Sequence, residues 1–228
     1  LRGLLLANPG LGIGEIGLDG SGRHRKSLAA QREVLRLQLG LAAELGRPVS
    51  LHCVRAAEAL IEDIGACKSA ADLRGHAGTP DSDATRDQGA TRDPGNAHGP
   101  RGPAELRDPG GTCSLASLRG PGGTSGPSGL RGLIHRFAAG PIEMQRFIEL
   151  GLHISLHPSI HQADPGRRAL IAACPPHRLL LESDSQSGPD LAVLRRHYSL
   201  TAALLDKTPV QLAQQVLSNA GSGSIFTD

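Results

Sequence analysis

Four side chains that commonly bind divalent cations lie in short apolar segments or at their ends. Glu15 and Asp184 carry carboxylates, and His52 and His135 carry imidazoles. Taken singly, each has an ordinary explanation, since a histidine in an apolar strand is usually a hydrogen-bonded core residue. A carboxylate after a strand often caps the next helix. Taken together they predict a metal site, because burying four such groups without partners would cost several kcal/mol each. Imidazole with carboxylate suits Mg²⁺, Mn²⁺ or Zn²⁺.

Other polar residues and patterns near these four could also bind ligands. Arg55 follows the His52 segment, and its planar guanidinium could contact a phosphate, although a solvated residue of a first helical turn is an equal alternative. The run 12–17 matches Gly-x-Gly-x-x-Gly, but its glycines lie within a predicted strand rather than before a helix, so dinucleotide binding is rejected. His153, His157 and His161 recur every four residues, yet Pro158 breaks any helix between them, and we expect solvated loop histidines.

The candidate ligands are carried by alternating strand and helix patterns. Apolar runs predict strands at 13–18, 49–53, 133–137, 153–156 and 178–184. Apolar spacing and capping residues predict helices at about 28–45, 56–64, 141–150, 165–173, 191–206 and 209–218. This alternation predicts five βα units with a parallel sheet, and the first strand should be at an edge of it. Ligands bind at the carboxyl ends of such strands, so Glu15, His52, His135 and Asp184 should cluster there.

Residues 69–130 differ from the rest of the chain. They contain 13 glycines and 7 prolines, and no valine, isoleucine or aromatic residue. Such a segment buries too little apolar area to offset an ordering cost of about 1–2 kcal/mol per residue. We expect a disordered insertion that divides the fold into a first part, 1–68, and a second part, 131–228.

Composition restricts the class of protein. Lysine and arginine number 24 against 22 acidic residues, a net charge of +2, which excludes a strongly basic nucleic-acid binder. We find no apolar run of the roughly 20 residues that a membrane helix needs. The four cysteines form no Cys-x-x-Cys pair, so we expect reduced thiols in an intracellular, cytoplasmic protein. Residue 1 is Leu and the only methionine is Met144, so we expect a processed product or a fragment. Organelle targeting therefore stays open.

Several dispersed motifs resemble one family in the right order. They are Gly14-Glu-Ile-Gly-Leu-Asp19, Gln31 and Gln38, 47–55 (Arg-Pro-Val-Ser-Leu-His-Cys-Val-Arg), Leu133-Ile-His135, 147–155, 179–184 (Leu-Leu-Leu-Glu-Ser-Asp), Thr208-Pro209, 217–219 and Phe226. Together they resemble the TatD family of metal-dependent deoxyribonucleases. The resemblance covers nearly all of both folded parts and omits the insertion.

The resemblance implies a fold, an activity and residue roles. It implies a branch of the amidohydrolase-like TIM barrels that holds one or two divalent metals, Mg, Mn or Zn, and hydrolyses phosphodiesters of DNA. By the same resemblance Glu15 is a bridging carboxylate, His52 and His135 are metal ligands, and Asp184 is a ligand and candidate base for the attacking water. We find no pattern that predicts a protein partner.

The chain also departs from the family pattern. Family members begin with a strand bearing His-x-His, and none occurs in these 228 residues. A closed barrel needs eight strands and roughly 250 residues, so we expect a partial barrel that lacks the first strands. This chain alone should bind metal weakly and show little nuclease activity. Two other interpretations stay open: a non-catalytic remnant that binds a partner, and a hydrolase of small phosphoesters or amides.

Overall fold

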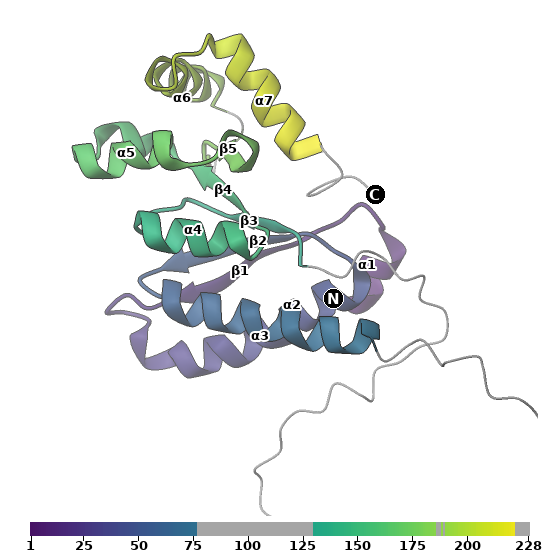
Figure 1. The fold of residues 1–228 in the computed structure, drawn as a ribbon. Coiled ribbons are helices and arrows are strands. Elements are labelled where there is room, and N and C mark those ends of the chain that lie inside the picture. The colour runs from purple at the N-terminus through teal and green to yellow at the C-terminus, as the bar shows by residue number, and fades with distance from the viewer. Residues whose placement is uncertain (77–129, 186–187, 189, 222–228) are drawn as a thin grey trace, which may run out of the picture. The chain divides into compact units, whose positions relative to one another are not determined.

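The computed structural model describes residues 1–76, 130–185, 188 and 190–221, and these contain a five-stranded parallel sheet (Figure 1). The strands are β1 (Ile13–Asp19), β2 (Val49–Val54), β3 (Gly132–Ile134), β4 (His153–Leu156) and β5 (Leu179–Leu181). Their order in the sheet follows the chain, β1-β2-β3-β4-β5, and every neighbouring pair is parallel. The predicted α/β class, its five parallel units and the edge position of the first strand are therefore confirmed.

Helices connect and cover these strands. They are α1 (Arg2–Ala7), α2 (Leu28–Leu45), α3 (Ala57–His76), α4 (Pro141–Glu149), α5 (Pro165–Ala173), α6 (Leu191–Leu204) and α7 (Pro209–Gly221). Short 3₁₀ turns are η1 (Arg25–Ser27), η3 (Pro158–Gln162) and η4 (Pro176–Arg178). Helix α2 packs on β1, α3 on β2, α4 on β4 and α7 on β5.

Helix ends follow from local chemistry. Asp164 caps α5, since its carboxylate accepts a hydrogen bond from the backbone N–H of Arg167 at 3.0 Å. Gly46 ends α2 in the left-handed conformation, with φ at 63°, which glycine adopts without steric cost. Pro141 occupies the first turn of α4, where its missing N–H is not needed.

Some element boundaries differ from the sequence prediction. Strands β3 and β5 end at Ile134 and Leu181, short of the predicted 137 and 184. Arg136 and Asp184 have φ of 44° and 47°, and a left-handed residue cannot continue a strand. Helix α3 continues to His76, past the expected start of the insertion at 69.

The core is built mainly from leucine and isoleucine. Leu18, Leu39 and Leu51 are fully buried. Phe147 is also fully buried and contacts Phe137 edge to face, with ring centroids 6.4 Å apart. Burial of this kind contributes roughly 25 cal/mol for each Å² of apolar surface removed from water.

The glycines of the 12–17 run serve strand packing. A Cβ atom added at Gly17 would lie 2.0 Å from the backbone oxygen of His52, and one at Gly14 would lie 2.7 Å from Cβ of Ser50. Strand β1 can approach β2 this closely because side chains are missing there. The run therefore lies in a strand, as expected, and close packing of β1 on β2 explains the spacing of its glycines without a bound dinucleotide.

The chain divides into two compact units, Leu1–Ala77 with Gly126–Asp228, and Gly78–Ser125. The second unit lies wholly outside the described residues, as do Cys113 and Phe226. Most of the insertion predicted at 69–130, namely 77–129, therefore lies outside the described residues. The division of the chain into 1–68, 69–130 and 131–228 stays a prediction. In the part of the chain that is described, no helix is both long and apolar enough to span a bilayer.

Candidate functional site

Two of the four candidate ligands lie within strands, and the other two follow strands. Glu15 is in β1 and His52 is in β2, while His135 directly follows β3 and Asp184 follows β5 by three residues. The side chains of His135 and Asp184 are 16% and 28% exposed, and those of His52 and Glu15 are 38% and 46% exposed. The group is therefore partly buried on one side and open to solvent on the other.

Pairwise contacts join these four side chains. Nδ1 of His52 lies 2.9 Å from Oε1 of Glu15, and Nε2 of His135 lies 3.5 Å from that same oxygen. Nε2 of His135 also lies 3.5 Å from Oδ1 of Asp184. One imidazole nitrogen thus stands between two carboxylates that come from opposite edges of the sheet. This brings the four predicted residues together.

Glu182 orients His135, a role that the sequence analysis did not assign. Its carboxylate accepts hydrogen bonds from Oγ of Ser155 at 2.6 Å and from the backbone N–H of Arg136 at 2.7 Å. It also lies 2.9 Å from Nδ1 of His135. A carboxylate only accepts, so Nδ1 carries the hydrogen of this contact, while Nε2 on the other side of the ring faces Glu15 and Asp184. A carboxylate behind a histidine in this way is the usual support of a metal ligand.

Glu182 could have been found from one feature of the sequence. It is an acid in an apolar run, two residues before Asp184, and a carboxylate there needs partners.

Asp184 has a second, positively charged partner. Nη1 of Arg136 lies 2.7 Å from Oδ2 of Asp184, while Oδ1 faces His135. The guanidinium therefore fixes the carboxylate orientation and offsets part of the negative charge of the site.

The backbone is strained where three of the strands end. Arg55, Arg136 and Asp184 have φ of 49°, 44° and 47°. Such conformations cost non-glycine residues about 1–3 kcal/mol each and cluster at functional sites. Here they turn the chain sharply after β2, β3 and β5, beside the side chains that form the site.

The four side chains are of types that bind divalent metals, but in this structure they contact one another only two at a time. Two imidazoles and two carboxylates suit Zn²⁺, Mn²⁺ or Mg²⁺, and ligands bound at about 2.1 Å to one ion lie roughly 3 Å apart. The contacts of 2.9 and 3.5 Å are close to that separation. Among the residues that the structure describes, however, no group of three or more His, Cys, Asp or Glu is arranged to hold an ion.

Arg55, the predicted phosphate contact, stays apart from this network. Its side chain is exposed after β2, and it makes no hydrogen bond or ion pair with the described residues. Cys53, next to His52, is not a nucleophile at neutral pH, because burial raises the pKa of its thiol to about 11.

Of the histidines 153, 157 and 161, which were expected to be solvated loop residues, His153 was interpreted wrongly; His157 and His161 are partly exposed after β4. His153 lies in β4 and is only 3% exposed, because all four residues of β4 are buried. His161 donates to His197, which is 1% exposed and was not singled out. Burial lowers the pKa of His153 and of His197 to about 4, so both imidazoles are neutral at pH 7.

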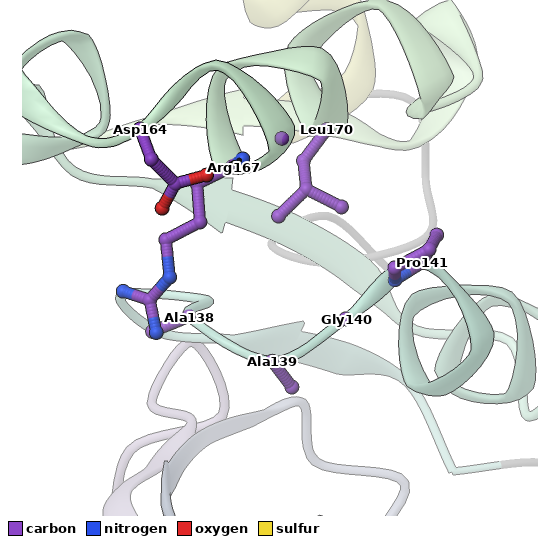
Figure 2. A pocket seen from close by; sticks show the side chains of 8 residues that line it. Ala138, Ala139, Gly140, Pro141, Asp164, Arg167 and Leu170 are labelled. Carbon is purple, nitrogen blue, oxygen red and sulfur yellow. Dashed lines mark hydrogen bonds between the residues drawn. The ribbon is translucent and has the colours of Figure 1, made fainter.

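Two cavities adjoin the loops after β3 and β4. One, of about 280 Å³, lies between the 138–141 loop and the start of α5 (Figure 2). The other, of about 200 Å³, is lined in part by Arg136 and His157. Because Arg136 also contacts Asp184, the second cavity adjoins the candidate metal site.

Comparison with known proteins gives one family and several solved structures of similar fold. The family model described as TatD related DNase matches residues 4–220. The crystal structure of YJJV, a TatD homolog from Escherichia coli K12, is 21% identical with a TM-score of 0.62, over 99% of this chain and 68% of that chain. An uncharacterized amidohydrolase from Saccharomyces cerevisiae is 15% identical with a TM-score of 0.62, over 97% of this chain and 68% of that one.

A hydrolase TatD family protein from Entamoeba histolytica is 13% identical with a TM-score of 0.59, over 99% of this chain and 67% of that chain. Comparison with curated proteins finds no match. At these identities the solved structures show a shared fold.

Proposed function

The chain belongs to the family of TatD-related DNases, and from that premise we propose that it hydrolyses phosphodiester bonds of DNA with the help of divalent metal. The family and its amidohydrolase-like fold make the chain a TatD-type hydrolase. The observation that supports the finer proposal is the contact network of Glu15, His52, His135 and Asp184, in which Nε2 of His135 faces two carboxylates.

These four side chains would hold the metal, Mg, Mn or Zn, in one or two positions. A bound divalent ion would polarise the phosphoryl oxygens and lower the pKa of a bound water. Glu15, which contacts both His52 and His135, is the candidate bridging ligand. Glu182, 2.9 Å from Nδ1 of His135, would orient the ring so that Nε2 points toward the metal.

Asp184 is the proposed base. Its Oδ2 is held by Arg136, and its Oδ1 is directed toward the centre of the group. Oδ1 would accept the proton of the attacking water as the water oxygen adds to phosphorus. The P–O bond to one nucleoside would break, and the leaving oxygen would take a proton from solvent. Arg55 is proposed as a contact to the phosphate, since its exposed guanidinium has no partner among the described residues.

The test compares two aspartates that share a backbone conformation. Asp184 and Asp206 have φ of 47° and 52°, and asparagine tolerates this left-handed region well. Single-stranded DNA hydrolysis is measured with Mg²⁺ or Mn²⁺, and Mn²⁺ affinity is measured by titration calorimetry. Because a partial barrel should cleave DNA slowly, we expect slow hydrolysis by the wild type. We expect Asp184→Asn to lower that rate by at least about 100-fold and to weaken Mn²⁺ binding, and Asp206→Asn to change neither.

Other outcomes decide against the proposal. Equal hydrolysis by Asp184→Asn and the wild type would remove Asp184 from the mechanism. Cleavage of small phosphodiesters or amides without cleavage of DNA would favour a small-molecule hydrolase. If the wild type binds Mn²⁺ but cleaves nothing, the chain is a non-catalytic binding protein.

A further inference from the structure

We propose that the smaller cavity beside the candidate metal site is a subsite for a phosphate group of the DNA strand next to the cleaved bond, with Arg167 as its main contact. This inference rests on the proposed function, and it adds a specificity-determining residue that the four candidate ligands do not include. Arg167 comes from α5, in the βα unit after β4, which contributes none of those four.

The charge of the cavity favours an anion. Arg136 and Arg167 both line it, together with the polar side chains of His157 and Ser159. No acidic residue is among the described residues that line it. The pKa of His157 is lowered by burial, so the two guanidinium groups carry the positive charge. Planar guanidinium groups suit the oxygens of a phosphate.

Arg167 is available for a ligand. Figure 2 shows its side chain extending from α5 toward the loop that carries Ala138, and both residues line the two cavities. Its guanidinium makes no hydrogen bond or ion pair with the described part of the chain, although its backbone N–H is capped by Asp164. Arg136, in contrast, is already paired with Asp184. An arginine that extends over a cavity without a partner is a suitable contact for an incoming phosphate.

The size and position of the cavity indicate part of a longer substrate. Its volume of about 200 Å³ is below the roughly 300–1,000 Å³ of sites that enclose a whole small ligand. It adjoins the metal site through Arg136, which contacts Asp184 at 2.7 Å. A strand cleaved at that site would bring a neighbouring phosphate to Arg167, whereas a substrate with a single phosphate would leave the subsite empty.

The test measures binding of a 10-nucleotide single-stranded DNA by fluorescence anisotropy, with EDTA present so that no cleavage occurs. We expect Arg167→Gln to raise Kd about three- to five-fold, the effect of one exposed charged contact. The slope of log Kd against log salt should become shallower by about 0.7, as for the loss of one phosphate contact on a single strand. Arg167→Lys, which keeps the charge, should restore the slope.

Arg168→Gln is the matched control. Arg168 is the next residue of α5, it is exposed, and it does not line the cavity. This variant should bind DNA as the wild type does. A dinucleoside monophosphate, which has one phosphate, should show no difference between Arg167→Gln and the wild type.

The inference is overturned by any of three results: equal effects of Arg167→Gln and Arg168→Gln, an Arg167→Lys variant that behaves like Arg167→Gln, or no DNA binding by the wild type. Hydrolysis is measured separately with Mn²⁺. A chain that binds as expected but cleaves nothing would contradict the proposed function and leave the subsite supported.

Discussion

Two buried histidines should make the fold sensitive to mild acid. Burial, the largest cause in both cases, lowers the pKa of His153 and His197 to about 4, and the charge of Arg178 also disfavours a charged His153. In the unfolded chain both should titrate near 6.5. As the pH falls below 6.5, the unfolded state binds protons that the folded state does not bind. This part of the stability is therefore complete above about pH 6.5 and is lost as the pH falls toward 4.

The structure shows why His197 resists protonation. Its Nε2 donates to the backbone oxygen of Leu156 at 2.8 Å, so its Nδ1 is the acceptor of the 2.8 Å hydrogen bond from Nε2 of His161. A proton on Nδ1 would place two N–H groups against each other. Because the pKa is about 4 in the folded state, each such histidine should lower the free energy of unfolding by about 2 kcal/mol between pH 7 and pH 5. The two histidines together should lower it by about 4 kcal/mol.

Urea unfolding followed by circular dichroism at pH 7, 6 and 5, in EDTA, measures this loss. The pH range lies above the usual titration of carboxyl groups. His197→Gln removes one titrating group, while the glutamine amide can still donate to the backbone oxygen of Leu156. The free energy of unfolding of this variant should therefore fall between pH 7 and pH 5 by about half as much as that of the wild type. His24→Gln, a change at an exposed histidine, controls for the substitution itself. A His197→Gln variant with the full pH dependence of the wild type would refute this account.

Two further predictions concern packing and charge. Gly17→Ala should destabilise the fold by about 3 kcal/mol or more, because the added Cβ would lie 2.0 Å from the backbone oxygen of His52. Gly65→Ala should stabilise the fold by about 0.5–1 kcal/mol, because Gly65 lies in α3 with open space around it. Asp63 is 2% exposed and pairs with two arginines, so Asp63→Asn should lower the free energy of unfolding by about 3 kcal/mol. Glu62→Gln, which breaks an exposed ion pair, should lower it by less than about 1 kcal/mol. Urea unfolding at pH 7 measures all four; equal effects within either pair would contradict the reasoning.

Much of the fold could be predicted because its signals are local. Asp164 caps a helix and Gly46 ends one through contacts with residues a few positions away, so sequence pattern is enough to place these ends. The grouping of Glu15, His52 and Asp184 could also be predicted, since parallel strands bring their carboxyl ends to one edge of a sheet.

The remaining features depend on residues far apart in the chain. Glu182 supports His135 across 47 positions, and Arg136 meets Asp184 across 48. The burial of His153 depends on its neighbours in the sheet, and Gly17 is needed because β2 comes so close. The sequence by itself determined the elements and the types of ligand, because helix caps and strand patterns act between near neighbours. Only the tertiary structure decided which groups are buried, paired or left free, since burial and pairing depend on which distant residues meet.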